Sequence, residues 1–215
     1  MVSFGLISEG PTDQIVIESI LFGVFNNPDL PITALQPKPH EPGNWVRVFD
    51  YCGSNEFKSA LAFNDFLIIQ IDTDIMIREK MPDKYKIDLS SDLSVEETIE
   101  KVVAKFIQLM DDKNGFWANH GERVIFAISV HSIECWLLPI YYNTQHQKAG
   151  KTTGCMESLN KALTKQEGFY IDKKEEQYYR IVCKKLRKQI KSIYTLNPSL
   201  RAFVENIEAK NIKID

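Results

Sequence analysis

The sequence predicts an α/β fold with a mainly parallel sheet, flanking helices and a helical C-terminal extension. Three observations support this prediction. Short, mostly apolar runs have the composition of strands buried on both faces; they cover 2–7, 66–71 and 123–130. Stretches with helical periodicity separate these runs, beginning at Pro11 and after Ser94. Every amphipathic stretch after residue 146 has a helical period.

The first strand, Val2 to Ile7, leads directly into a turn and a helix. Glu9 follows the strand, Gly10 permits a sharp turn, and Pro11 suits the first helical turn because its missing N–H is not needed there. The helix buries one face, formed by Ile17, Ile20, Leu21 and Val24. We therefore expect Glu9 at the carboxyl end of the strand, with Asp13 one helical turn later and close by.

A second strand, Phe66 to Ile71, ends in Asp72, Thr73 and Asp74. It is apolar apart from a single glutamine, which is typical of a central strand. Ligands of open α/β sheets bind at the carboxyl ends of the strands. The two strand tips together would present four carboxylates at that edge, without a matching cluster of Lys or Arg nearby in the sequence.

The remaining elements follow in order. The proline-rich segment 26–44 predicts a loop, and 45–51 alternates as a strand would. Ser54 is expected to cap a helix over 55–63, and Ser94 with Glu97 forms a capping box. Glu134 follows the strand 123–130, in the same relation to it as Glu9 and Asp72 to theirs. The extension predicts helices over 156–163, 175–193 and 200–207.

Charge divides the chain into two parts. The net charge is −3, but residues 1–146 carry 11 Lys and Arg against 21 Asp and Glu, whereas residues 147–215 carry 15 against 8. We interpret this as a catalytic domain over 1–146 with a basic helical extension over 147–215 packed on it. Lys184, Arg187, Lys188 and Lys191 could bind nucleic-acid phosphates, although an ordinary solvated helix face also explains them.

The sequence also bears on compartment. No apolar run approaches the length of a membrane span, and the N-terminus has no basic region typical of a secretory signal. We expect a cytoplasmic protein with no membrane partner. The four cysteines form no Cys-x-x-Cys pair, so we expect them to be reduced and mostly buried rather than zinc ligands.

The four acids Glu9, Asp13, Asp72 and Asp74 would meet if the two strands are neighbours. Two like charges about 4 Å apart repel by roughly 4 kcal/mol at an effective dielectric constant of 20. Such a group needs a cation, and Mg²⁺ or Mn²⁺ prefers hard oxygen ligands. In the alternative reading, Asp13 faces solvent and Asp72 or Asp74 only caps a loop.

These motifs resemble the Toprim domain. The Glu9-Gly10 turn after one strand and Asp72-Thr73-Asp74 after another carry the resemblance, and the Glu-Gly-Pro-Thr-Asp form is most similar to the nuclease branch that includes the overcoming-lysogenisation-defect nucleases. Ser132, Glu134 and Trp136-Leu137-Leu138 resemble a signature of stand-alone bacterial Toprim-like proteins, and 197–203 is similar to their closing helix. Pro139 departs from that pattern, because those relatives tend to carry Ala-Asp there.

The resemblance implies a metal-dependent nuclease that acts on DNA or RNA, in phage defence or nucleic-acid processing. It implies Glu9, Asp13, Asp72 and Asp74 as ligands of Mg²⁺ or Mn²⁺, with two ions about 3.5–4 Å apart stabilising the attacking and leaving oxygens. Glu9, Asp72, Asp74 and Glu134 are the expected catalytic set. Glu134 is either a further ligand or water-positioning group, or a satisfied buried glutamate beside an apolar segment.

Two other functions remain open from the sequence. A non-catalytic, Toprim-like binding or regulatory subunit that works with an ATPase partner protein would need no active site. A nucleotide-sugar transferase would use Asp72-x-Asp74 to hold a metal and a diphosphate, but it gives no reason for Glu9 and Asp13. A dehalogenase-type phosphatase is disfavoured, because its Asp-x-Asp would lie near the N-terminus. The sequence predicts no oligomeric state.

Overall fold

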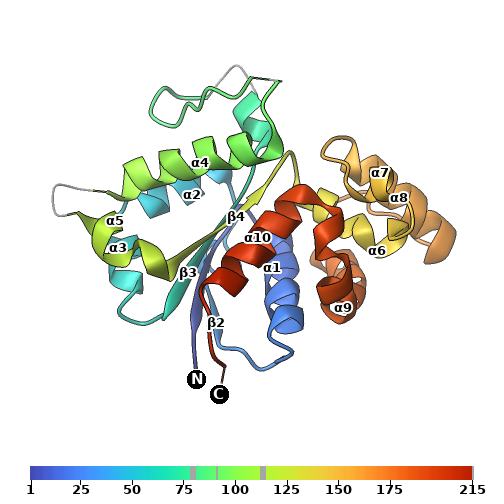
Figure 1. Ribbon diagram of the computed structural model, residues 1–215, viewed down its shortest axis with the longest axis horizontal. Helices are drawn as coiled ribbons and strands as arrows, with labels where there is room; N and C mark the ends of the chain where they lie inside the picture. The colour runs from blue at the N-terminus through green and yellow to red at the C-terminus, as the bar shows by residue number, and fades with distance from the viewer. Residues whose placement is uncertain (78–80, 91, 112–114, 215) are drawn as a thin grey trace.

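The protein is built around a four-stranded, all-parallel sheet with helices on both faces (Figure 1). The computed structural model describes residues 1–77, 81–90, 92–111 and 115–214. The strands lie in the order β2-β1-β3-β4 and comprise β1 (Phe4–Ile7), β2 (Ile32–Gln36), β3 (Phe66–Asp72) and β4 (Val124–Ser129). The register places Ile7 opposite Ile69 and Asp72 opposite Ser129. The predicted α/β class and parallel sheet are therefore confirmed.

Helices connect and follow these strands. The α-helices are α1 (Pro11–Val24), α2 (Trp45–Cys52), α3 (Asn55–Ala60), α4 (Val95–Met110), α5 (Phe116–His120), α6 (Pro139–Tyr142), α7 (His146–Ala149), α8 (Cys155–Gln166), α9 (Glu176–Ile193) and α10 (Pro198–Ala209). The 3-10 helices are η1 (Asp74–Ile77), η2 (Gly121–Arg123), η3 (Ile133–Leu137) and η4 (Tyr194–Leu196). The predicted caps form: Ser54 accepts from the Phe57 N–H, and Ser94 and Glu97 make a reciprocal capping box.

Side chains of the central strands alternate between two separate cores, as the pleat of a strand requires. In β3, Ile68 packs with α1, α9 and α10, whereas Leu67, Ile69 and Ile71 pack with α2, α3 and α4. Gln70 and Asp72 follow Ile68 by two and four residues, so their side chains point to the same face of the sheet as that of Ile68. The acidic tip of β3 therefore projects towards the layer that contains α1 and α9.

The extension completes one of these layers. Helix α9 packs along α1, and α10 packs against β4, so that the core on this face contains side chains from both sides of residue 146 (Figure 1). The indole of the buried Trp136 stacks on Phe203 at 5.3 Å and donates a hydrogen bond to the Ser199 hydroxyl. The extension is thus packed on the rest of the chain through a continuous apolar core.

Gly23 permits the close approach of α1 and α9. A Cβ atom at Gly23 would lie 2.4 Å from the Arg187 carbonyl oxygen and 2.4 Å from Ile190 Cγ2. We expect Gly23→Ala to lower the free energy of unfolding by about 1–3 kcal/mol, because the two backbones must separate. Urea unfolding measures this change. The matched control is Gly53→Ala, whose Cβ would meet nothing closer than 3.7 Å; an equal loss in both variants would contradict the close-packing argument.

Two local predictions were wrong. The segment 45–51 is helical in α2 rather than extended, because Asn44 caps it and the buried residues Val48, Phe49 and Cys52 follow a helical spacing. The proline-rich segment contains β2, an edge strand flanked by Pro31 and Pro37. The apolar segment 135–142 begins within the 3-10 helix η3, and the α-helix α6 starts at Pro139.

The expectation of four reduced cysteines was also wrong. Cys135 and Cys155 form a disulfide, whereas Cys52 and Cys183 are free and buried. No spacing in the sequence pairs these two residues, because the packing of η3 against α8 brings them together. Within the described residues, no helix has both the length and the apolar character that crossing a bilayer requires.

Candidate functional site

The tips of β1 and β3 meet, as the sequence predicts. The Glu9 carboxylate accepts a hydrogen bond from the Asp72 backbone N–H at 2.7 Å. Gln70, in β3, bridges the two tips: its side-chain carbonyl accepts from the Glu9 N–H at 3.2 Å, and its amide donates to Asp72 Oδ1 at 3.0 Å. The single polar residue of the predicted strand thus holds the two acidic segments together.

The tip of β4 joins the same edge. The Thr73 N–H donates to the Ser129 carbonyl, and the Asp74 N–H donates to the His131 carbonyl, each at 3.0 Å. The Thr73 hydroxyl accepts from the His131 N–H at 2.7 Å. These bonds tie the turn after β4 to that after β3, and they bring Glu134, in η3, towards the other acids.

We name these five carboxylates the acid cluster: Glu9, Asp13, Asp72, Asp74 and Glu134. Asp13 lies in the first turn of α1 and is buried, and its Oδ1 has no hydrogen-bond partner among the described residues. Asp72 and Glu134 are also buried, whereas Asp74 begins η1 and is partly exposed. All predicted acidic site residues therefore gather at one edge of the sheet.

Burial and mutual repulsion change how these groups ionise. Desolvation and the charge of Asp13 raise the pKa of Glu9 to about 8, and the Asp74 charge adds to this effect. Desolvation raises the pKa of Asp13 to about 7, against the attraction of Lys174. Desolvation, followed by the charges of Asp13 and Glu9, raises the pKa of Asp72 well above its usual value. Near neutral pH the cluster therefore retains protons.

Glu134 has a different environment. Its carboxylate accepts a hydrogen bond from the Tyr179 hydroxyl at 2.6 Å and forms an ion pair with Lys174 Nζ at 2.9 Å. Burial would raise the pKa of Glu134, but the Lys174 charge and these hydrogen bonds outweigh it and hold the pKa below its usual value. This geometry corresponds to the alternative in which Glu134 is a satisfied buried glutamate.

Lys174 places a positive charge among these acids. Burial would lower the pKa of its ammonium, but the charges of Glu134, Asp13 and Asp72 raise it above its usual value. One ammonium offsets only part of the charge of five carboxylates. Lys174 also lines a surface cleft of about 820 Å³, together with Glu9, Asp13 and residues at the start of α9. The cleft thereby reaches the partly exposed Glu9 and the buried Asp13 behind it.

The acid cluster offers the oxygen ligands and the negative charge that a divalent cation requires. Its side chains are not arranged around a common point in this structure. Carboxylate oxygens are the preferred ligands of Mg²⁺ and Mn²⁺, and Asp13 Oδ1 is an unpartnered buried acceptor. Nevertheless, in the part of the chain that the structure describes, no three Asp, Glu, His or Cys side chains are grouped as metal ligands. The oxygens of Glu9, Asp72 and Glu134 contact the Asp72 N–H, Gln70 and Lys174 instead.

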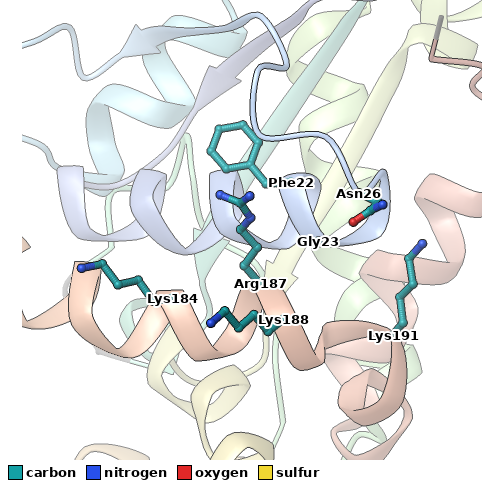
Figure 2. A pocket seen from close by; sticks show the side chains of 7 residues that line it. All are labelled: Phe22, Gly23, Asn26, Lys184, Arg187, Lys188 and Lys191. Carbon is teal, nitrogen blue, oxygen red and sulfur yellow. The ribbon is translucent and has the colours of Figure 1, made fainter.

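The four predicted nucleic-acid-binding residues lie together elsewhere. They line a cavity of about 700 Å³, which we name the basic groove, between the end of α1 and the outer side of α9 (Figure 2). Its lining comprises Phe22, Gly23, Asn26, Lys184, Arg187, Lys188 and Lys191. The Arg187 guanidinium lies 5.8 Å from the centroid of the Phe22 ring.

Three residues that organise the acid cluster were not predicted to act there. Gln70 could have been suspected, because it is the single polar residue in an apolar strand. Lys174 lies far along the chain in a basic segment, and no pattern distinguishes it from its neighbour Lys173. Tyr179 was missed because it has a tyrosine neighbour in Tyr178, and the structure buries Tyr179 fully and Tyr178 only in part.

Comparisons of this chain with protein-family models, with curated proteins and with solved structures yield no match.

Proposed function

We propose that this protein is a metal-dependent phosphodiesterase that cleaves DNA or RNA. The observation that carries this proposal is the meeting of Glu9 and Asp72 at adjacent strand tips with Asp13 in the first turn of α1, beside Lys174. A group of buried acids with raised pKa values is typical of a functional site rather than of a stabilising one. The Toprim resemblance of the two acidic motifs points to the same chemistry.

In this proposal Glu9, Asp13 and Asp72 would hold Mg²⁺ or Mn²⁺, with Asp74 at the solvent side. When bound, such an ion activates water and stabilises charge on a phosphate. Other residues of the chain position the acids and contact the substrate. Gln70 fixes the separation of the two strand tips, and Glu134 with Tyr179 orients Lys174. The ammonium of Lys174, at the wall of the cleft, is placed to contact a phosphate oxygen of the substrate.

A second function is favoured by one specific observation. Lys174 already supplies a positive charge to the acid cluster, and no three acids of the described residues surround a common point. A non-catalytic binding subunit, working with a partner such as an ATPase, would have this arrangement permanently. In a catalyst, by contrast, a divalent ion must draw the carboxylates of Glu9, Asp13 and Asp72 together.

Metal dependence distinguishes the two functions. Purified protein is incubated with labelled plasmid DNA and with labelled RNA in Mg²⁺, in Mn²⁺ and in EDTA, and metal binding is measured by calorimetry. We expect a divalent ion to bind and at least one substrate to be cut only when the ion is present. Failure to bind either ion would contradict the nuclease proposal, and binding without cleavage of any substrate would favour the binding subunit.

A further inference from the structure

The basic groove is lined by four cations of α9. Among the residues that the structure describes, none of Lys184, Arg187, Lys188 and Lys191 has an acidic partner within 4 Å, and the three lysines and the arginine are exposed. Their neighbours on the same helix differ: Arg180 pairs with Glu176 at 2.8 Å, and Lys185 pairs with Glu167. Within α9, the basic residues without an acidic partner are therefore the ones that line this groove.

The geometry of the four cations fits a chain of phosphates. Arg187 and Lys188 each lie three or four residues from both Lys184 and Lys191, so the four form a stripe along α9 that rises about 10 Å from Lys184 to Lys191 (Figure 2). Two such charges about 6 Å apart in water repel by roughly 0.7 kcal/mol, which an anion with several charges would relieve. A single phosphate could contact only part of this stripe.

The groove is also partly organised before any ligand binds. The Phe22 ring lies beneath the Arg187 guanidinium and restrains it, and Gly23 allows the backbone of α9 to lie directly against α1. Asn26, just after α1, supplies an amide that can donate to an oxygen. Cations, an amide donor and an aromatic face are the components with which proteins hold nucleic-acid strands.

The two helices connect this groove to the acid cluster. Helix α1 begins beside Asp13 and ends at the groove, and α9 begins after Lys174 and passes the groove at Arg187. Both helices therefore run from one site to the other. Ten residues separate Asp13 from Gly23, which corresponds to about 15 Å of helix. A ligand that reaches both sites must be several nucleotides long.

We propose that the basic groove is a backbone anchor that holds the phosphodiester chain of a DNA or RNA strand at a distance from the acid cluster. This inference rests on the proposed function, because it names how the same substrate is gripped. It makes binding depend on strand length: a short oligonucleotide reaches one site, and a long one reaches both. The contacts are to phosphates, so they select polynucleotides without selecting a base sequence.

The test measures binding without cleavage. Fluorescein-labelled single strands of 4 and 20 nucleotides, and a duplex of 20 base pairs, are titrated in EDTA by fluorescence anisotropy, at several salt concentrations. The variant is Lys184→Gln/Lys188→Gln. The matched control is Lys101→Gln/Lys105→Gln, which removes the same charge from α4, on the opposite face of the sheet. Circular dichroism and thermal unfolding check that all proteins are folded.

We expect the groove variant to bind the 20-nucleotide ligand about 5- to 20-fold more weakly, with the slope of log affinity against log salt reduced by about 1.5. The control should bind both ligands with the affinity of the wild type. In the groove variant, the affinity for the 4-nucleotide ligand should fall less than that for the 20-nucleotide ligand. Unchanged binding of the long ligand by the groove variant would overturn the inference. So would inorganic phosphate or polyglutamate competing as well as DNA at equal charge.

These outcomes separate the anchor from the nuclease. If the groove variant loses binding but no metal supports cleavage in any protein, the anchor stands and the proposed catalysis fails. If the wild type cuts nucleic acid with a metal and the groove variant binds and cuts equally well, the catalysis stands and the anchor fails.

Discussion

Replacing Asp72 by asparagine should abolish metal-dependent cleavage while making the metal-free protein more stable. Asparagine keeps the shape of the side chain and can still accept the hydrogen bond from Gln70, but it carries no charge. A lost metal ligand should lower the cleavage rate by about 1,000-fold or more. Removing one of several buried carboxylates should raise the free energy of unfolding by about 1–2 kcal/mol at pH 8.

The two effects of Asp72→Asn are measured separately. Single-turnover cleavage in Mn²⁺ gives the rate, and urea unfolding in EDTA gives the stability. Asp29→Asn, an exposed aspartate after α1, removes the same charge far from the acid cluster and should change neither quantity appreciably. Retained cleavage in Asp72→Asn would exclude Asp72 from the reaction. A lower free energy of unfolding would show that the charge of Asp72 does not destabilise the native fold.

The stability of the metal-free protein should fall as pH rises from about 5 to 8. The pKa values of Glu9 and Asp13 are raised to about 8 and about 7, whereas in the unfolded chain both carboxyls ionise near pH 4. Between these values the folded state binds more protons than the unfolded state, so unfolding becomes easier at each step up in pH. Below about pH 4 this contribution is fully present, and above about pH 8 it is lost.

Urea unfolding in EDTA at intervals from pH 5 to 9 measures this dependence. We expect a total loss on the order of several kcal/mol, because both carboxyls release bound protons over this range. Adding Mn²⁺ at pH 8 should restore stability, because the ion replaces the lost protons. The Glu9→Gln/Asp13→Asn variant should show a flatter profile and little response to Mn²⁺. A wild-type profile that is flat or rises with pH would contradict the proposed electrostatics.

The sequence predicts the framework of the site well, and physical rules explain why. Buried parallel strands are long apolar runs, and their carboxyl ends share one edge, so Glu9 and Asp72 could be brought together from pattern alone. Edge strands and short helices lack such a signature. β2 lies within a proline-rich segment, and α2 alternates over a few residues in a way that fits either structure.

The partners of the acids could not be predicted in the same way. Lys174 and Tyr179 reach the acid cluster only because α9 packs along α1, and this packing depends on the fit of Gly23 against the backbone of α9. Hydrophobic periodicity places residues on helices and strands, but it does not determine which helix of an extension lies over which strand tip. The four cations of the basic groove were predictable as a group, because they share one stripe of one helix.

The packing of α9 along α1 has a consequence for dissecting the molecule. A fragment that stopped at residue 146 would expose the apolar flank of α1 and the side of β4 that α10 now shields. The fragment would also lack Lys174, which pairs with Glu134, so the repulsion among the five acids would increase. Residue 146, where the charge of the chain changes sign, is thus not a boundary at which the protein can be truncated without exposing its core.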